Sequence, residues 1–439
     1  MENMENETEF TFETNMEANT ETDTETNLEN DKESNKENGI KSNTKLIDSE
    51  PILIETPVEI SEAESTESNT EAQKTDAQKI SEIEKITEQV TAPAKSDDEM
   101  LLEFVERSKP KIYVVGTGGS GTNTLNRLFE LSVKDVSLIA MNTDARHLLK
   151  IRAHKKLLLG KTTTKGHGAG SNPELGEAAA KESTGDIKNI LSDANMVFVT
   201  CGMGGGTGTG SAATIAEQAK TTGALVISVI TLPFASEGKI RFENALRGLE
   251  KLKKQSDTVI VIKNDKLLTL APNLPLNTAF RVCDEVLAGA VKGIAELVTK
   301  TGLVNVDFAD LKTILTQSGF AVIGIGESSM DAKAEDRATV AVETALNSPL
   351  LDADLSGADR ALVNVIGGED MTLKEAELIV SETAKKIHPN AHIIWGARIE
   401  SASQKSSIRT MVVLAGVKFT KEDMGVGFGL ESLDLDLVG

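Results

Sequence analysis

The chain has 439 residues, and its 68 acidic and 46 basic side chains give a formal net charge of −22. Residues 1–100 contain 28 acidic residues and 8 lysines, so the rest of the chain is nearly neutral. A near-neutral body argues against a general nucleic-acid binder. No apolar run reaches the length of a membrane span, and the two cysteines, Cys201 and Cys283, cannot form a disulfide framework. These features favour a protein of the reducing cytosol without direct membrane insertion.

The N-terminal region, residues 1–108, is predicted to be a disordered acidic extension. It is rich in Glu, Asn, Thr and Ser, and has few apolar side chains. Such a segment cannot bury enough surface to offset the loss of chain entropy on folding. The folded body is expected to begin at Lys111–Val115, a short apolar run typical of a buried strand.

A glycine-rich loop follows this first strand. Gly116, Gly118 and Gly121 form the pattern Gly-x-Gly-x-x-Gly, and a helix is predicted from Asn123 to Leu131. A second strand, 136–141, ends at Asn142-Thr143-Asp144, where a ribose-binding carboxylate is often found. Taken alone, residues 111–145 favour a nicotinamide-binding unit of a dehydrogenase. Further glycine-bearing loops along the chain argue against this alternative, because a dinucleotide unit needs one such loop.

The most informative stretch is residues 202–210, which contain six glycines in nine residues with two threonines between them. The apolar run Met196–Thr200 precedes it as a predicted strand, and Ser211–Lys220 follows as a predicted helix. Glycine lets backbone N–H groups crowd around an anion, and a helix N-terminus adds unpaired N–H groups and a favourable dipole. This stretch is therefore predicted to bind phosphate.

The remaining pattern predicts an α/β protein with a doubly wound parallel sheet, since apolar strands at 224–231 and 258–262 alternate with helices. A long apolar-periodic helix at 276–300 is expected to join this domain to a smaller α+β domain. Ligands of such sheets bind at the carboxyl ends of the strands, where the glycine loops gather.

The run Gly204–Gly210 resembles the glycine-rich motif shared by the tubulin/FtsZ family, and residues 111–418 resemble that family throughout. The resemblance implies a GTP-dependent, self-assembling GTPase of the cell-division ring, acting in the cytoplasm at mid-cell. It also divides the chain into five parts. They are a disordered extension (1–108), a GTP-binding domain (109–285), a central helix and linker (286–306), a C-terminal domain (307–420) and an acidic, apolar tail (421–439).

The resemblance implies a set of nucleotide-binding residues. Those expected near the phosphates are Gly118, Gly119, Gly121, Asn123, Asn142, Asp144, Ala145, Gly168, Ala169, Gly170, Gly204, Gly205, Gly206, Thr207, Gly208, Thr209 and Gly210. Those expected near the ribose, phosphates and base are Pro233, Glu237, Arg241, Asn264, Phe280 and Asp284.

Two of these assignments have independent chemical support. The guanine N1–H and N2–H₂ groups lie side by side, and the Asp284 carboxylate can accept from both, whereas adenine offers no such donors. Phe280 lies four residues earlier, on the same helix face, and can stack on the base. Without the resemblance, a core Phe280 and a solvated Asp284 are the better interpretation.

The catalytic residues implied by the resemblance are Asp307 and Asp310, in a loop that completes the site of a neighbouring subunit. Their spacing at a predicted helix start places both carboxylates on one face, where they can polarise the attacking water, aided by Mg²⁺ on the phosphates. An N-cap role for this pair is the alternative, and both roles can hold together. Shared sites imply head-to-tail contacts that do not close, and hence a homopolymeric filament.

Two residues depart from the family pattern. Ser120 stands where a glycine is common in the family, and Lys263 where a proline often precedes Asn264. The C-terminal end is similar to that of archaeal members of the family, and this resemblance implies membrane anchoring through an adaptor of the SepF type. A tubulin-like regulator that binds GTP but hydrolyses little is the alternative function, although retention of Asp307 and Asp310 argues against it.

Overall fold

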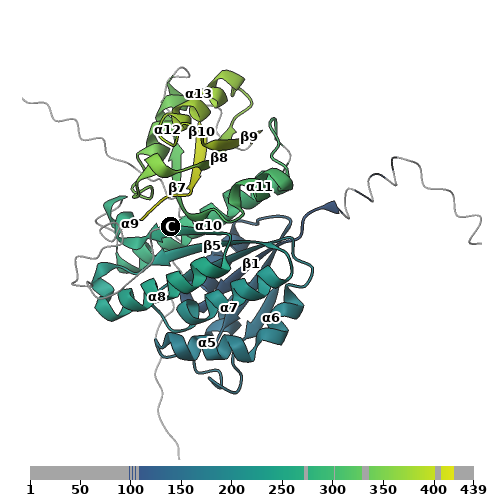
Figure 1. Cartoon of the computed structure of the whole chain (residues 1–439), viewed down its shortest axis with the longest axis vertical. Helices are drawn as coiled ribbons and strands as arrows, with labels where there is room; N and C mark the ends of the chain where they lie inside the picture. The colour runs from purple at the N-terminus through teal and green to yellow at the C-terminus, as the bar shows by residue number, and fades with distance from the viewer. Residues whose placement is uncertain are drawn as a thin grey trace, which may run out of the picture. The chain divides into compact units, whose positions relative to one another are not determined.

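The structure of this protein is a computed structural model, shown in Figure 1. It describes residues 98, 101, 104, 108–270, 275–300, 302–328, 336–400 and 407–419. The predicted disordered extension and the C-terminal tail therefore lie almost wholly outside the described residues.

One sheet runs through the described part of the chain. Its strands are β1 (Ile112–Thr117), β2 (Val136–Asn142), β3 (Lys155–Leu158), β4 (Met196–Gly202), β5 (Leu225–Leu232), β6 (Thr258–Lys263), β7 (Gly319–Glu327), β8 (Arg360–Gly367), β9 (His392–Ile399) and β10 (Ile408–Ala415). Their spatial order is β3-β2-β1-β4-β5-β6-β7-β10-β8-β9. The first six strands are all parallel, as expected for a doubly wound sheet.

Helices cover both faces of this sheet (Figure 1). They are α3 (Gly118–Glu130), α4 (Ala145–Lys150), α5 (Pro173–Glu182), α6 (Thr184–Ile190), α7 (Thr207–Thr221), α8 (Lys239–Gln255), α9 (Asn264–Leu270), α10 (Leu276–Thr299), α11 (Phe308–Leu315), α12 (Arg337–Leu346) and α13 (Leu373–Ala384). Short 3₁₀ turns lie at η1 (Ala235–Glu237) and η2 (Leu355–Gly357).

Two apolar cores separate these layers. Val115 on β1 points into the core that α5, α6, α7 and α8 cover, whereas its neighbour Val114 points into the core under α3, α4, α10 and α11. Successive side chains of a strand point to opposite faces, so a strand buried on both faces must be apolar throughout. This explains why the inner strands were recognisable as continuous apolar runs.

The C-terminal domain continues the same sheet instead of forming a separate one. The start of β6 pairs in parallel with the start of β7 at Thr258–Gly319, Val259–Phe320 and Ile260–Ala321. β10 then pairs antiparallel with both β7 and β8, which gives this half its mixed character. The predicted long helix corresponds to α10, which packs in the core on one face of the sheet. None of the described helices is long and apolar enough to cross a membrane.

Several predicted boundaries were wrong. The helices expected from Asn123 and Ser211 begin earlier, at Gly118 and Thr207, so part of each glycine-rich stretch forms a first helical turn. β3 was not predicted from the sequence. It is a four-residue edge strand, KKLL, whose two exposed lysines give no apolar strand pattern. Cys201 and Cys283 are buried, and burial raises the pKa of each thiol to about 12.

Candidate active site

Two helix N-termini meet at the carboxyl edge of the parallel strands. α3 starts directly after β1, and four residues separate the end of β4 from the start of α7. A Cβ atom on Gly118 would lie 2.7 Å from the Gly208 amide nitrogen, so the two first turns are in contact. Neither N-terminus has a side-chain cap, since the flanking Thr117 and Gly206 make no capping hydrogen bond. Unpaired N–H groups at two adjacent helix starts form a site suited to a polyphosphate.

The neighbouring helices α4 and α5 are different because their N-termini are capped. The Asp144 carboxylate accepts hydrogen bonds from the amides of Arg146 (2.9 Å) and His147 (3.1 Å), and these bonds hold its pKa below the ordinary value. The Asn172 side chain accepts from the Leu175 amide at 3.1 Å. These N–H groups already donate to capping side chains and are not available to a phosphate, so α3 and α7 are the better anion sites.

Short contacts tie the predicted loops into one unit. The hydroxyls of Thr143 and Thr207 are 2.6 Å apart, and link the loop after β2 to the start of α7. The Gly168 amide donates to the Thr143 carbonyl at 3.1 Å. A Cβ atom on Gly206 would lie 2.9 Å from the Ala169 Cβ atom. Counted after the loop that follows β1, the second loop (142–145), the third loop (168–170) and the fourth loop (204–210) are therefore held together at one edge of the sheet.

The glycines of the fourth loop have two different roles. Gly204 adopts φ +95°, a backbone conformation that favours glycine, and its amide donates to the Thr209 hydroxyl at 2.8 Å. A Cβ atom on Gly210 would lie 2.1 Å from the Pro173 carbonyl oxygen. The Gly210 amide already donates to the Gly206 carbonyl at 3.0 Å, so this glycine serves helix packing within the site.

The other predicted phosphate residues are arranged around this centre. Asn142 is buried and accepts from the Asp144 amide, and the Ala145 amide donates to Gly166. Gly121 lies against the Thr200 carbonyl oxygen, where a Cβ atom would approach to 2.2 Å. Gly119 and Gly170 lie on the open side of the site, because a Cβ atom added to either would have no neighbour within 4 Å. Asn123 is exposed.

An ion pair lies on the fourth-loop side of the site, after the buried Pro233. One oxygen of Glu237 accepts from the Phe234 amide at 2.9 Å, and the other contacts the Arg241 guanidinium at 2.6 Å. The Arg241 Nη2 atom lies 4.0 Å from the position of a Cβ on Gly205. This contact brings a cation to the edge of the glycine loop, where it can neutralise phosphate charge.

The predicted base-site residues lie at the start of α9 and in the first half of α10. Phe280 leaves 42% of its surface exposed, and its ring contacts Phe234 edge-on with a centroid distance of 5.4 Å. The Asn264 side chain is 6% exposed, and its Oδ1 atom has no hydrogen-bond partner among the described residues. Burial raises the pKa of Asp284 from 3.8 to about 7, despite a hydrogen bond from Ser120. An unsatisfied buried acceptor and a carboxylate beside an open aromatic face fit a base rich in N–H donors.

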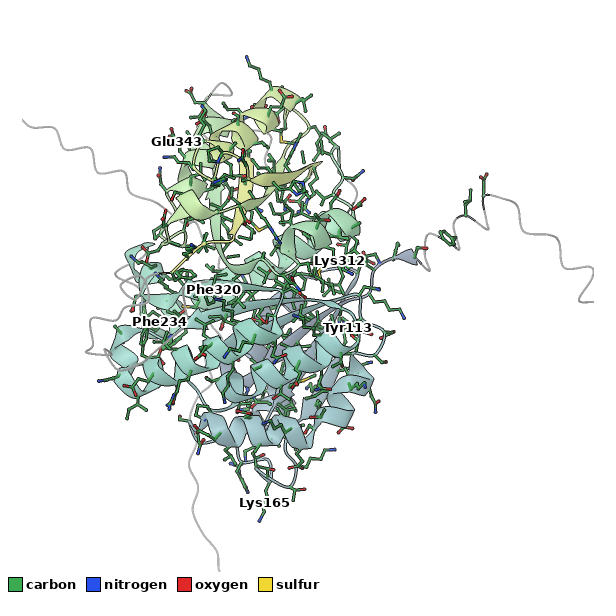
Figure 2. All side chains as sticks on the ribbon, viewed as in Figure 1. Tyr113, Lys165, Phe234, Lys312, Phe320 and Glu343 are labelled. Carbon is green, nitrogen blue, oxygen red and sulfur yellow. The ribbon has the colours of Figure 1, made fainter. Side chains whose placement is uncertain are left out.

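The acidic pair lies far from this pocket. Asp307 is the N-cap of α11, and its carboxylate accepts from the Asp310 amide at 2.6 Å. The other end of α11 contacts the first residue of β6, because the Thr258 hydroxyl donates to the Leu315 carbonyl. α11 therefore ends at the amino edge of the parallel strands, the edge opposite the glycine loops. In Figure 2, Phe234 beside the base site and Lys312 on α11 lie on opposite sides of the view.

Two contributors to this site were not predicted from the sequence. Phe234 forms the aromatic wall beside Phe280, and the Thr143 hydroxyl bonds that of Thr207. Phe234 directly follows the predicted Pro233, but nothing local indicates that it meets Phe280. The hydroxyl contact depends on tertiary packing alone.

Together, the doubly wound sheet, the paired helix N-termini and the acceptor-rich base site define a purine-nucleotide-binding protein. The family model described as the GTPase domain of the tubulin/FtsZ family matches residues 111–272, and the C-terminal domain of the FtsZ family matches residues 319–418. The chain therefore belongs to the tubulin/FtsZ family. The first match also excludes the dehydrogenase interpretation that residues 111–145 alone favour.

Individual relatives agree with the family match. The chain is 49% identical over 355 residues to "Cell division protein FtsZ 1" of Methanocaldococcus jannaschii, covering 81% of this chain and 95% of that protein. It is 56% identical over 321 residues to "Cell division protein FtsZ" of Methanothermobacter thermautotrophicus, covering 73% and 83%. A solved structure described as an empty FtsZ dimer of M. jannaschii matches with a TM-score of 0.69 and 51% identity, covering 74% and 93%.

Proposed function

We propose that this GTPase assembles head to tail into filaments of the cytoplasmic cell-division ring, and hydrolyses GTP where two subunits meet. The observation that carries this proposal is the separation of its two half-sites. Asp284 of the base site and Thr299, the last residue of α10 before the acidic pair, are 15 residues apart on one helix, a span of about 22 Å. A subunit cannot bring Asp307 or Asp310 to its own nucleotide over such a distance, whereas a second subunit stacked on the glycine loops can.

The pocket residues bind and orient the nucleotide. The N–H groups at the starts of α3 and α7 hold the phosphates, and Arg241 neutralises part of their charge. Asp284 accepts from the guanine N1–H and N2–H₂ groups while Phe280 stacks on the ring. A donor on the base can bond the Asn264 Oδ1 atom, which has no hydrogen-bond partner among the described residues. GTP and GDP both fit this arrangement, because the pocket recognises features common to the two.

Magnesium accompanies the phosphates in this proposal. The described residues contain no group of three or more His, Cys, Asp or Glu side chains placed to hold a metal ion. Mg²⁺ commonly keeps several waters and binds through nucleotide phosphates, so this donor set fits an ion held chiefly by the substrate. When bound, it supplies charge neutralisation to the transferring phosphoryl group.

The acidic pair acts on water. Asp307 and Asp310 are both exposed, and the cap hydrogen bond leaves one Asp307 oxygen and the whole Asp310 carboxylate facing solvent. Pressed against a neighbour's pocket, these acceptors orient a water molecule towards the γ-phosphate and draw on its proton. The nucleotide pocket itself contains no comparable unengaged pair, since Glu237 and Asp144 are occupied by hydrogen bonds and an ion pair.

Mixing two variants tests the shared site. Asp307→Ala has an intact nucleotide pocket but an incomplete acidic pair, whereas Asp284→Asn has an intact acidic pair but a weakened pocket. Neither variant alone can therefore form a complete site at a GTP concentration that just saturates the wild type. An equimolar mixture should recover about a quarter of wild-type phosphate release, the share of contacts that join a good pocket to a good acidic pair. A mixture no faster than the mean of the separate variants would overturn the shared site.

The same measurement on wild-type protein tests the alternative function, a tubulin-like regulator with little hydrolysis. Turnover per subunit that rises steeply above a threshold concentration indicates assembly-dependent catalysis. Turnover near zero at every concentration, with tight GTP binding, favours the regulator.

Anchoring is the last part of the proposal. The relatives are described as cell-division proteins, which supports action at the mid-cell division site. None of the described helices could span a membrane. We assign this role to an adaptor of the SepF type that binds the C-terminal tail, a segment outside the described residues. Loss of division-site localisation on removal of residues 421–439, with GTP turnover intact, is the expected result.

A further inference from the structure

The edge of the sheet that β3 forms is strongly basic. Residues 134–165 contain eight lysines and arginines and only two acids, Asp135 and Asp144, which gives this segment a formal charge of +6. All eight cations are exposed, and none forms an ion pair with another described residue. They are Lys134, Arg146, Lys150, Arg152, Lys155, Lys156, Lys161 and Lys165. We call the surface that they form the basic edge.

The acids beside this surface are already engaged. The Asp144 carboxylate caps α4. The Glu182 carboxylate accepts from the amides of Thr162 and Thr163 at 2.8 Å and 2.9 Å. The positive charge of the basic edge is therefore left without a counterpart in the folded body.

Contacts between α3, α4 and β3 make the basic edge one surface. The Lys156 ammonium of β3 donates to the Leu149 carbonyl of α4 at 3.0 Å. The ring of His154, which directly precedes β3, lies 6.3 Å from the ring of Phe129 on α3. Leu149 and Phe129 leave 78% and 42% of their surfaces exposed, so apolar side chains lie among the cations.

The lysines alone could serve another purpose. β3 is the last strand at one side of the sheet, and lysines on such a strand discourage pairing with a second sheet. Exposed Leu149 and Phe129 do not fit that purpose. Cations with apolar side chains between them suit a segment that presents acids with apolar side chains between them.

The N-terminal end of the chain has this complementary composition. Residues 1–31 contain eleven acidic side chains and no lysine or arginine. Phe10 and Phe12 lie in this run, between Glu9 and Glu13. A second apolar run, 52–54, is less suited because lysines occur at positions 41 and 45 before it.

The N-terminal segment can reach the basic edge of its own chain. The chain enters the sheet at β1, β1 pairs with β2, and β2 pairs with β3, so the edge lies two strands, or about 10 Å, from the entry point. Two groups joined by a linker of about 100 residues meet at an effective concentration on the order of 1 mM. Even a weak contact is well populated at that concentration.

We propose that residues 1–31 dock on the basic edge of the same chain, with Phe10 and Phe12 against Leu149 and Phe129. The surrounding carboxylates face the exposed lysines of α4 and β3. The docked segment covers the free side of the edge strand. This inference is independent of the proposed shared active site.

Carbodiimide cross-linking, which joins carboxylates directly to lysines, tests the proposal on the full chain with GDP. An equal mixture of ¹⁴N and ¹⁵N chains, analysed by mass spectrometry, separates contacts within a chain from contacts between chains. In 0.1 M salt, we expect residues 1–31 to join Lys150, Lys155 or Lys156 in peptide pairs of one isotope. The yield should fall at least about threefold in 1 M salt, where the screening length drops from about 10 Å to about 3 Å.

Two sets of variants and reference residues give the control. Phe10→Ser combined with Phe12→Ser retains every lysine and carboxylate, and should lower the yield at least about threefold because the apolar contact is lost. Ile52→Ser combined with Ile54→Ser is the matched control, and should leave the yield unchanged. The exposed lysines outside the basic edge that serve as the reference for yield are Lys188, Lys374 and Lys386.

Three results would overturn the proposal. The first is a yield at the basic edge no higher than at the reference lysines, or one that the double Phe variant leaves unchanged. The second is a frequency of mixed-isotope pairs equal to that of matched pairs, which would assign the contact to a neighbouring chain. The third is an edge that forms no cross-link to residues 1–31 but is shielded from acetylation by duplex DNA or by phosphatidylserine vesicles, which would assign the surface to that partner.

Discussion

The two roles of Asp307 can be separated by substitution. Asp307→Ala removes both the N-cap of α11 and the carboxylate charge, whereas Asp307→Asn keeps an acceptor for the Asp310 amide and removes only the charge. If the carboxylate serves the neighbour's nucleotide, the two variants should lose turnover alike. If it serves only the helix, Asp307→Asn should behave as wild type.

The magnitudes make this comparison decisive. Loss of an N-cap destabilises a protein by about 1 kcal/mol. A domain with a free energy of unfolding of at least about 5 kcal/mol then remains more than 99% folded, so cap loss cannot reduce activity measurably through unfolding. Loss of a group that orients water in the transition state slows hydrolysis by about 10²–10⁴-fold.

The assay is phosphate release at saturating GTP, with light scattering to follow assembly and GDP titration to confirm an intact pocket. Both variants should bind GDP as wild type does and assemble into longer-lived filaments, with turnover reduced at least about 100-fold. The thermal midpoint should fall by a few degrees in Asp307→Ala only. Asp307→Asn with more than half of wild-type turnover would refute the catalytic role.

Further predictions concern the nucleotide pocket. Asp284→Asn should bind GTP poorly and XTP well in competition titrations, because the xanthine C2 carbonyl accepts from the new amide; equal loss of both nucleotides would contradict the base contact. Since only the ionised Asp284 accepts from guanine and its pKa is about 7, wild-type GDP affinity should rise from pH 6 to 8 relative to Asp284→Asn. The same raised pKa means that the empty folded protein holds this proton more tightly than the unfolded chain. The bound proton of Asp284 therefore stabilises the folded protein fully below about pH 4, and this stabilisation is lost as the pH rises through 7. The thermal midpoint of the wild type should fall relative to that of Asp284→Asn over that range. Gly210→Ala places a Cβ 2.1 Å from the Pro173 carbonyl oxygen and should destabilise the protein by about 1–3 kcal/mol in urea unfolding, and an unchanged midpoint would contradict this packing.

The inner strands and the position of the glycine loops were predictable because their signals are local. β4 and β5 are apolar on both faces, and this pattern is visible in any short window of the sequence. Glycine and threonine are weak helix formers, however, so Gly118 and Thr207 were expected to lie in loops. Tertiary contacts reverse this local preference, since the α7 turn packs against Pro173 so closely that only glycine fits at Gly210.

Features formed between distant segments gave no local signal. The sheet continues across the two domains through a few residue pairs at the starts of β6 and β7, and no residue pattern distinguishes this join from a gap between two sheets. Asp144 was expected near the nucleotide from its place after a strand, and only its hydrogen bonds show that it caps α4. The contact of Phe234 with Phe280 joins residues 46 positions apart and required the structure.

In the proposed head-to-tail filament, the placement of the glycine loops and of the end of α11 at opposite edges of the sheet would make the two tips unlike. At one tip the last subunit has its nucleotide uncovered, with no partner to supply an acidic pair, so that nucleotide persists as GTP. At the other tip an acidic pair faces solvent with nothing to act on. Growth and shortening at these two tips therefore depend on different chemical events, and the polymer has an inherent direction.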